Sequence, residues 1–396
     1  MTEAAFADPR AADPGSIGIY VHWPYCARIC PYCDFNVVRD RGQGEAQAAL
    51  ARAIVADLTA QAASLGPRRL GSIFFGGGTP SLMAPAWVAE IVRTAQRLFE
   101  PASDLEITLE ANPTDAEAAR FAALAEAGVN RLSLGVQSLD DTALAFLGRN
   151  HSAAEARRAA ELAGRVFPRL SIDLIYALPG QTPATWRAAL TQALALGPEH
   201  VSPYQLTLEP GTAFDRAVQR GRWAPPEADL AGALFETTEA VLGDAGFEAY
   251  EVSNHARGEA ARSRHNLTYW RGGDYLGVGP GAHGRITSDA GRWSTLTPSR
   301  IADYIAKVET TGCGLDERIR LTPREASLER LLMGLRTREG VPRADLAPLD
   351  LDPAVIAEFA DRGLIEATSD RLIATRHGRA VLDRVTLELA QSTRAG

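Results

Sequence analysis

The sequence predicts an α/β protein built on a parallel sheet, either a partial barrel or a doubly wound sheet. Short β-rich segments alternate with alanine-rich amphipathic segments through the first two-thirds of the 396 residues, which is the pattern of βα units. Six strand candidates are too few for a closed eight-stranded barrel. In either architecture, functional side chains gather at the carboxyl ends of the strands.

The expected strands are short and apolar, and segments with helical periodicity separate them. In chain order the strands are Ile17–His22, Ser72–Gly76, Leu105–Glu110, Arg131–Val136, Leu170–Ala177 and His200–Leu206. The expected helices are Ala46–Leu65, Pro85–Leu98, Asp115–Ala127, Ala153–Val166, Pro183–Leu196 and Asp229–Ala245.

The last third changes character twice. A segment rich in Gly, Arg and Trp, from 250 to about 299, has no regular periodicity, and we expect it to be irregular. The tail then combines two helices, 324–336 and 353–362, with strand candidates at 363–366 and 371–374 and a final helix from 375, which is the order of a winged-helix module. We therefore expect three parts: 15–248, 249–316 and 317–396.

Composition and charge narrow the class of function. A formal charge of -8 argues against binding to nucleic acid, because such proteins usually carry a basic face. No run approaches the roughly 18 apolar residues of a membrane span. The acidic start lacks the basic and apolar parts of a signal peptide. The expected location is the reducing cytoplasm, where clustered cysteines bind metal or act in catalysis.

Three cysteines, Cys26, Cys30 and Cys33, follow the first strand with the spacing C-x3-C-x2-C. Thiolates are the usual ligands of iron–sulfur clusters, and three of them leave one iron of a four-iron cluster open to another ligand. The alternative is a structural zinc site, which needs four ligands, with Cys313 or His22 as the fourth. Zinc sites favour paired C-x2-C units, and a second pair is missing from the sequence, so iron–sulfur is the stronger interpretation.

Further polar or glycine positions lie at or near the ends of the later strands. They are Gly77, Gly78, Thr79, Glu110, Gln137, Arg149 and Asp173. Each alone could be structural, as a turn, a helix cap or a satisfied buried group. Together they could form a ligand shell, since a carboxylate accepts hydrogen bonds from an ammonium or a ribose and an arginine fork suits a carboxylate.

On these motifs the sequence resembles the radical S-adenosylmethionine (SAM) superfamily. The resemblance implies a partial (β/α)6 barrel, followed by an α+β region and a winged-helix-like module. It also implies a [4Fe–4S] cluster held by the three cysteines, with SAM on the open iron. The residues that the resemblance places against SAM are Tyr20, Tyr32, Gly77, Gly78, Thr79, Glu110, Gln137, Arg149 and Asp173.

A narrower resemblance covers nearly the whole chain. The segments Tyr-Val-His-Trp-Pro-Tyr-Cys, Glu-Ala-Asn-Pro, Gly-Val-Gln-Ser and Asp-Leu-Ile-Tyr-Ala-Leu-Pro-Gly-Gln resemble the oxygen-independent coproporphyrinogen III oxidase-like family. The oxidases of that family carry a fourth cysteine two residues after the third. Here Phe35 occupies this position, as in the haem chaperone HemW branch, which makes decarboxylation of coproporphyrinogen doubtful.

A second marker of that branch is the segment from His265 to Trp270, which resembles a motif linked to haem binding. Imidazole is a common axial haem ligand, and Tyr269 with Trp270 could flank a porphyrin. Alternatively, the segment only packs against the barrel. His255 and His283 are competing ligands.

The resulting hypothesis is a cytoplasmic haem chaperone with a SAM-bound [4Fe–4S] cluster. It would deliver haem to apo-haemoproteins such as respiratory enzymes, would need an electron donor for the cluster, and is compatible with peripheral membrane contact. The enzymatic alternative is a coproporphyrinogen III dehydrogenase, in which a deoxyadenosyl radical abstracts hydrogen from the propionates. A zinc-binding structural protein is the third hypothesis.

Overall fold

The computed structural model describes residues 15–42 and 44–393, and its centre is one open sheet of 12 strands. Six neighbouring strands are parallel. They are β1 (Ser16–Trp23), β4 (Arg69–Gly77), β5 (Glu100–Ala111), β6 (Arg131–Gln137), β7 (Arg169–Tyr176) and β8 (His200–Gln205). These are the six strands that the sequence predicts, in chain order across the sheet, so the expected α/β fold is confirmed.

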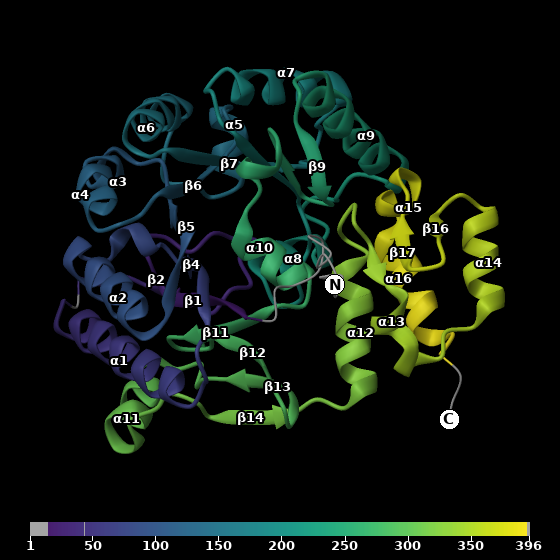
Figure 1. Ribbon diagram of the computed structural model, residues 1–396. Coiled ribbons are helices and arrows are strands. Elements are labelled where there is room, and N and C mark those ends of the chain that lie inside the picture. Colours follow the sequence, from purple (N-terminus) through teal and green to yellow (C-terminus); the bar gives the residue numbers. More distant parts are fainter. Residues whose placement is uncertain (1–14, 43, 394–396) are drawn as a thin grey trace.

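Helices cover the convex face of the sheet as an outer layer (Figure 1). They are α1 (Gly44–Ala63), α2 (Pro85–Leu98), α3 (Asp115–Ala118), α4 (Phe121–Glu126), α6 (Ala153–Val166), α7 (Pro183–Leu194) and α9 (Ala228–Asp244). The short helix α5 (Asp141–Phe146) lies instead at the carboxyl ends of the strands, where Phe146 packs against Phe214. The helix expected over Asp115–Ala127 is interrupted and forms α3 and α4. Capping boxes at Ser152 and Thr182 start α6 and α7. In each, the hydroxyl of the first residue accepts from the backbone N–H three residues later, and the side chain at that later position accepts from the backbone N–H of the first residue.

The two faces of the parallel strands differ in chemistry. Residues such as Ile19, Phe75 and Leu109 are fully buried in the main apolar core. Many of the alternate residues are polar, among them Glu106 and Asp173, with Phe74 and Ile175 as apolar exceptions. Side chains alternate between the faces of a strand, and parallel strands buried on both faces are usually apolar throughout. A polar concave face therefore marks a lumen built to hold polar groups.

The segment expected to be irregular, 250–299, is ordered and extends the sheet at both edges. On one side, β10 (Asn254–Ala256) and β9 (Glu248–Glu251) continue antiparallel from β8. On the other, β11 (Asp274–Val278) pairs parallel with β1. The strands β12 (His283–Ser288), β13 (Gly291–Leu296) and β14 (Glu317–Arg320) follow antiparallel. Short strands with distant partners leave little local periodicity, which is why the expectation was wrong.

Helix α10 (Arg264–Trp270) lies on the concave side of the sheet, in contact with β1, β4 and β11 (Figure 1). The carboxylate of Glu106, from inside β5, accepts hydrogen bonds from the backbone N–H groups of Arg264 and His265, both at 3.2 Å. Arg169 Nη1 pairs with the same carboxylate at 2.7 Å. This buried ion pair therefore fixes the start of α10 inside the lumen.

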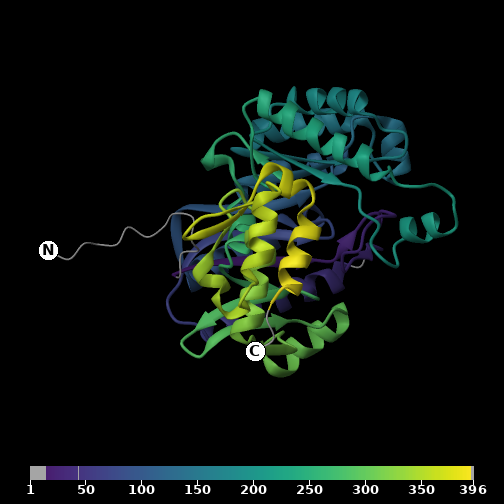
Figure 2. The ribbon, with the colours of Figure 1, turned by 90° about the vertical axis from the view of Figure 1, so that its right-hand side faces the viewer.

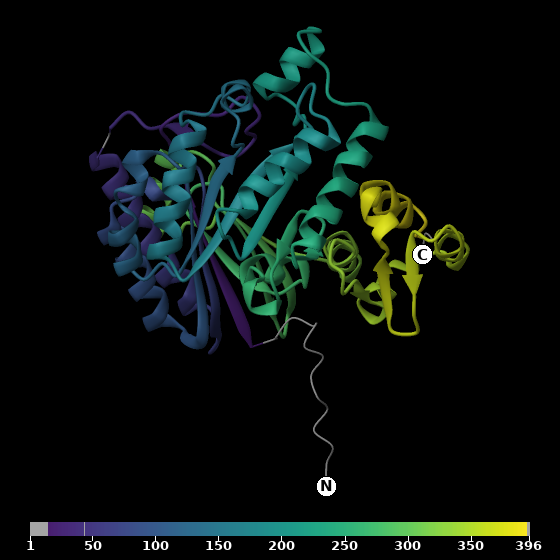
Figure 3. The ribbon, with the colours of Figure 1, turned by 90° about the horizontal axis from the view of Figure 1, so that it is seen from above.

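The C-terminal module lies beside the barrel, at its open side (Figures 2 and 3). Its helices are α12 (Pro323–Gly334), α13 (Arg343–Leu346), α14 (Pro353–Asp361), α15 (Arg376–Ala380) and α16 (Leu382–Gln391). Its small sheet has the order β15 (Val341–Pro342), β17 (Arg371–Ala374), β16 (Ile365–Ala367). The antiparallel pair β16–β17 matches the expected wing. The module has its own apolar core, which includes Leu331, Phe359 and Leu372; the exact domain boundaries stay predictions.

Charged contacts hold this module against α10. Arg271 Nε donates to Glu339 at 2.9 Å, and Arg336 pairs with the buried carboxylate of Glu251 at 3.0 Å. The Arg336 guanidinium also lies 4.7 Å from the centre of the Trp270 ring, a favourable cation–π distance. Among the described helices, none is long and apolar enough to cross a membrane.

Candidate functional site

The three cysteines lie on a loop that leaves the carboxyl end of β1. Cys26 is in the short strand β2 (Tyr25–Cys26), which pairs with β3 (Val38–Arg39), and Cys33 N donates to Cys30 O at 3.2 Å. Cys26 is buried, while Cys30 and Cys33 are partly exposed. The loop thus presents three thiols at the rim of the lumen.

Burial favours the protonated form of two of these thiols, Cys26 and Cys33. Burial raises the pKa of Cys26 to about 11, and burial also raises the pKa of Cys33. A nucleophilic cysteine needs the opposite shift. A cationic cluster would supply the charge that ionises the thiols, so their chemistry fits metal ligation better than covalent catalysis.

The two candidate fourth ligands of a structural zinc site, Cys313 and His22, contact other groups. In residues 15–42 and 44–393, no three His, Cys, Asp or Glu side chains converge on one ion position. Cys313 lies elsewhere, with its sulfur 3.6 Å from Asp57 Oδ1. Both ring nitrogens of His22 are engaged, by Tyr20 OH at 3.1 Å and Asn36 O at 2.8 Å. In a four-iron cluster each thiolate binds a different iron, so convergence on one point is not required.

Two of the residues predicted to bind SAM contact the thiols. Thr79 Oγ1 lies 3.6 Å from Cys26 Sγ, and Arg149 Nη1 lies 3.3 Å from Cys30 Sγ. Asn112 joins them: its amide nitrogen donates to Thr79 Oγ1 at 3.0 Å, and its oxygen accepts from Arg149. The residues predicted from the sequence to contact SAM do not include Asn112, although the Glu-Ala-Asn-Pro motif contains it.

The glycine run supports the base of the cysteine loop. Gly78 N donates to Trp23 O at 2.7 Å, and Thr79 N donates to Tyr25 O at 2.8 Å. Gly77 has φ of +103°, and a Cβ there would lie 2.5 Å from the His22 ring. A Cβ on Gly78 would lie 2.7 Å from Tyr25 O. Both positions therefore require glycine for close backbone approach.

Two carboxyl groups, Glu110 and Asp173, lie in the lumen below the cysteine loop. Gly77 N donates to Glu110 Oε2 at 3.2 Å, and Ser133 Oγ donates to Asp173 Oδ2 at 2.9 Å. Burial, and next the charge of Asp173, raise the pKa of Glu110 to about 8. Burial also raises the pKa of Asp173. A cationic ligand between them would offset both penalties.

Two buried polar atoms of the same wall have no partner among the described residues: Gln137 Oε1 and Arg149 Nε. Buried polar atoms are normally hydrogen-bonded, and an exception inside a site points to an absent ligand. Gln137 also has φ of +62°, an unusual conformation for a residue other than glycine. The wall therefore fits a ligand that carries both an ammonium and a carboxylate, as SAM does.

The two tyrosines predicted to contact SAM lie in different surroundings. Tyr32 adjoins Cys30 and Arg149, whose charges act on its hydroxyl, and its ring packs against Phe214 of α8 (Ala213–Gln219). Tyr20 lies deeper, with its ring stacked on Phe74 and on His265 at centroid distances of 6.3 and 6.2 Å. Tyr32 thus belongs to the thiol end, and Tyr20 separates that end from α10.

The predicted haem residues lie in α10 and do not meet the cysteines. His265 is 1% exposed; its Nδ1 lies 3.1 Å from Ser72 Oγ and its Nε2 lies 2.7 Å from Tyr269 OH. Burial lowers the pKa of His265 to about 3. Trp270 contacts two arginines. The Arg336 guanidinium lies over its ring, and Arg330 Nη1 donates to its backbone carbonyl at 2.9 Å.

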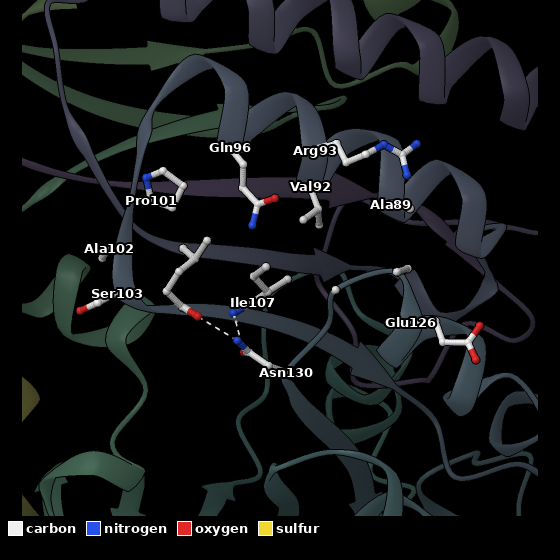
Figure 4. Close-up of a pocket in the computed structure, with 13 residues that line it drawn as sticks. Ala89, Val92, Arg93, Gln96, Pro101, Ala102, Ser103, Ile107, Glu126 and Asn130 are labelled. Atoms are coloured by element: carbon white, nitrogen blue, oxygen red, sulfur yellow. Dashed lines mark hydrogen bonds between the residues drawn. The ribbon is translucent and has the colours of Figure 1, made fainter.

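A separate pocket lies on the outside of the barrel, between α2 and the start of β5 (Figure 4). Gln96, Arg93 and Ile107 line it. The amide of Asn130 holds its floor by bonding Ile107 N and Leu105 O, both at 2.8 Å. Because α2 and the body of the sheet separate it from the cysteines, the pocket is not part of this site.

The chain matches two family models and several relatives of known name. Residues 20–193 match the model of the radical SAM superfamily, and residues 316–381 match the HemN C-terminal domain. The chain is 43% identical to the bovine mitochondrial protein called radical S-adenosyl methionine domain-containing protein 1, over 96% of this chain and 89% of the relative.

Bacterial relatives match over a similar share of the chain. The heme chaperone HemW of Mycobacterium tuberculosis is 36% identical over 95% of each chain, and that of Escherichia coli is 35% identical over 94% of this chain and 97% of the relative. Among solved structures, the E. coli coproporphyrinogen III oxidase HemN superposes with a TM-score of 0.79 at 22% identity, covering 99% of this chain and 94% of that one. The last similarity concerns the fold alone.

Proposed function

Because this chain belongs to the radical SAM family that includes the heme chaperone HemW, we propose that it binds haem and delivers it to apo-haemoproteins. The observation that carries the proposal is the full-length relation to HemW, over 95% of both chains in one case. Phe35, which is 62% exposed where the oxidases carry a fourth cysteine, is consistent with this branch.

The thiol end of the lumen supplies the ligands for a [4Fe–4S] cluster and SAM. Cys26, Cys30 and Cys33 would hold three irons, and SAM would complete the fourth. When bound and reduced, such a cluster supplies one-electron chemistry to SAM. Arg149 would pair with the SAM carboxylate, and Glu110 would accept from its ammonium or ribose.

The remaining predicted contacts surround the same position. They are Tyr20, Tyr32, Gly77, Gly78, Thr79, Gln137 and Asp173. The unpartnered atoms of Gln137 and Arg149 support this assignment. Whether SAM is cleaved during haem delivery is a separate matter from its binding.

Three histidines compete as the axial haem ligand, and they differ in accessibility. His265, the sequence-based choice, would have to give up both of its ring hydrogen bonds. His255 is buried and bonds Glu239 at 2.9 Å. His283 is exposed, and no hydrogen bond to its ring occurs among the described residues. Partial desolvation of its ring, and next the charge of Arg285, lower the pKa of His283, which favours the neutral, ligating form.

We therefore propose His283 as the accessible ligand, and we retain His265, Tyr269 and Trp270 as the alternative haem segment. His283 follows the loop of Pro280, whose carbonyl accepts from Asn36 Nδ2 at 2.9 Å. Asn36 adjoins Phe35, so the exposed imidazole and the exposed phenyl ring belong to connected parts of one rim.

A haem titration followed by absorbance tests this assignment. His283→Ala should weaken haem binding at least tenfold, while His377→Ala, a matched change at an exposed histidine of α15, should not. Loss of affinity in His265→Ala alone would instead support the α10 segment. Equal affinity in all variants would remove both assignments.

Delivery itself is tested by mixing the haem-loaded protein with an apo-haemoprotein, for example an apo-cytochrome of the respiratory chain. Transfer of the haem absorption to the acceptor is the expected result; retention by this protein would contradict chaperone function. Anaerobic conversion of coproporphyrinogen by the reconstituted protein would support the oxidase alternative. One zinc per chain without iron or sulfide would support the structural alternative. The proposed location is the cytoplasm, with peripheral membrane contact where the acceptors are membrane-bound.

A further inference from the structure

A row of buried polar side chains joins Asp173, in the wall of the proposed SAM site, to the start of α10. Ser171 and Asp173 are two residues apart in β7, so their side chains share one face of the strand. His200 of β8 is the register partner of Ser171, and Tyr250 of β9 completes the row. Ser171, His200 and Tyr250 are 0%, 0% and 3% exposed, so bulk solvent does not reach them. We call these three residues the Ser–His–Tyr bridge.

Hydrogen bonds connect the bridge at each step. Ser171 Oγ lies 3.3 Å from Asp173 Oδ1 and 2.8 Å from His200 Nδ1. His200 Nε2 lies 2.9 Å from Tyr250 OH, which accepts from the backbone N–H of Ser263 at 3.3 Å. Ser263 is the N-cap residue of α10. The bridge therefore ends on the helix that closes the floor of the lumen.

The position of each proton in the bridge follows from its one obligatory donor. The N–H of Ser263 can only donate, so the Tyr250 hydroxyl accepts it and directs its own proton to His200 Nε2. The imidazole is neutral, because burial lowers the pKa of His200 well below its ordinary value. Its proton is then on Nδ1 and points to Ser171 Oγ. The opposite tautomer would leave the phenol proton without an acceptor among the described residues.

The hydroxyl proton of Ser171 is the variable link. Since Oγ accepts from His200, its proton has two acceptors within reach, Asp173 Oδ1 at 3.3 Å and Ser202 Oγ at 3.4 Å. Both distances are long for a hydrogen bond between two oxygens. An ionised carboxylate is the stronger acceptor, and its bonds to hydroxyl groups shorten to about 2.5–2.7 Å. Ionised Asp173 therefore draws the Ser171 proton, and hydrogen bonds in series strengthen one another.

The charge on SAM changes the state of Asp173. Burial raises the pKa of this carboxyl group, which favours its neutral form in the ligand-free protein. SAM carries an ammonium and a sulfonium, and a nearby positive charge favours the ionised carboxylate, whose proton leaves to solvent. Ser133 Oγ lies closer to the other carboxyl oxygen, Oδ2, at 2.9 Å. Oδ1 is therefore the atom that transmits the change to Ser171.

We propose that the Ser–His–Tyr bridge couples SAM binding at Asp173 to the stability of α10. With SAM bound, the bridge aligns on the ionised carboxylate, and the Ser263 N–H at its far end is held more firmly. Coupling between two sites is reciprocal, so a fixed α10 in turn favours SAM. Because α10 carries the alternative haem segment, this segment responds to SAM. The inference rests on the SAM site of the proposed function, and it does not depend on haem delivery.

The test is hydrogen exchange of the α10 amides, measured by mass spectrometry on the protein with its cluster reconstituted, with and without SAM. In the unmodified protein, SAM should slow exchange in residues 263–270 by about fivefold or more, the lower end of typical coupling between sites. Tyr250→Phe keeps the ring and removes the hydroxyl. It should still bind SAM, with an affinity reduced by a similar factor, but lose the response of α10.

Tyr304→Phe is the matched control. Its buried hydroxyl also accepts from a backbone N–H, that of Gly279 at 3.0 Å, and donates to a buried side chain, Asp57 Oδ2 at 2.8 Å. This variant loses an equivalent pair of bonds outside the bridge, so α10 should still respond to SAM. If Tyr250→Phe folds poorly, Ser171→Ala decides, because it breaks the same bridge with a smaller change and should also lose the response.

An equal response to SAM in Tyr250→Phe and in the unmodified protein would overturn the proposal. SAM binding without any change at α10 would overturn the bridge alone, whereas failure of the unmodified protein to bind SAM would overturn the SAM site together with the bridge. The tautomer of His200 is a second readout. The 15N shifts of its ring should place the proton on Nδ1, and a proton on Nε2 would contradict the bridge.

Discussion

The two ends of the lumen are built from similar polar residues but differ in how their carboxyl and imidazole groups are satisfied. At the thiol end, Gln137 Oε1 and Arg149 Nε have no partner in the described chain, and Glu110 is held with a raised pKa. At the α10 end, both nitrogens of His265 are bonded, and Glu106 is paired with Arg169 and two backbone N–H groups; the unpartnered atoms there are Trp270 Nε1 and Arg131 Nε, which belong to neither group.

This difference separates a binding surface from a support. Unsatisfied buried groups cost free energy and persist where a ligand completes them. Satisfied networks make one conformation more rigid. The thiol end is therefore prepared for a ligand, while α10 fixes the floor of the lumen. Each prediction below tests one side of this contrast.

The largest expected effect is the loss of the cluster in Cys30→Ala. Two thiolates cannot hold three irons, so the visible absorption and the labile sulfide should disappear after reconstitution. Haem binding should remain, because the candidate haem ligands lie on other elements. A full complement of iron and sulfide in this variant would contradict ligation by three cysteines.

Next is the affinity for SAM in Arg149→Ala. The variant removes the guanidinium that contacts Cys30 and Asn112, and loss of a charge-assisted pair of about 1.5–3 kcal/mol corresponds to roughly 10- to 150-fold weaker binding. Equilibrium binding to the reconstituted protein measures this. Arg149→Lys keeps the charge but not the fork, so its dissociation constant for SAM should lie between those of the unmodified protein and of Arg149→Ala. An unchanged dissociation constant in both variants would exclude Arg149 from the site.

A structural role of α10 predicts a stability effect for His265→Ala. The change opens a cavity and leaves Ser72 Oγ and Tyr269 OH without their partner, which together should lower the free energy of unfolding by about 2–4 kcal/mol. Chemical denaturation measures it. His283→Ala, at an exposed position, should shift stability by no more than about 0.5 kcal/mol; equal effects of the two changes would contradict the contrast.

The remaining expected effect is a pH dependence caused by Glu110. Its folded-state pKa of about 8 exceeds the ordinary value of 4.5, so between these values the folded state holds a proton that the unfolded state has lost. Stability of the ligand-free protein should therefore fall as pH rises from about 4.5 to 8 and level off above it. Glu110→Gln should flatten this slope, and an identical pH profile would show that Glu110 is ionised at neutral pH.

Local patterns were sufficient to predict much of the barrel. The strands from Ile17–His22 to His200–Leu206 were found because each apolar run is separated from the next by a helix with strong caps or periodicity, as at Ser152 and Thr182. Most residues predicted for the thiol site sit at or near strand ends, and neighbouring parallel strands end at one edge, which is why one sequence pattern could predict them together.

Other features depended on distant contacts. Asn112 belongs to the site only because its amide bonds Thr79 on one side and Arg149 on the other. Two of the strands between 250 and 299, β11 and β10, pair with β1 and β8, which are far away in the chain. The residues of these short strands show no alternation that would predict this pairing. The accessibility of His265 and of His283 likewise follows from what packs around each ring.

By itself, then, the sequence determined the parallel α/β core and the spacing of the three thiols, because periodicity and spacing are local properties of the chain. Its motifs determined the family by resemblance. Only the tertiary structure decided which polar groups are satisfied. It buried His265 between Ser72 and Tyr269 and left His283 exposed. The physical reason is that burial and hydrogen bonding depend on neighbours far apart in the chain, and these neighbours separate a ligand-ready group from a structural one.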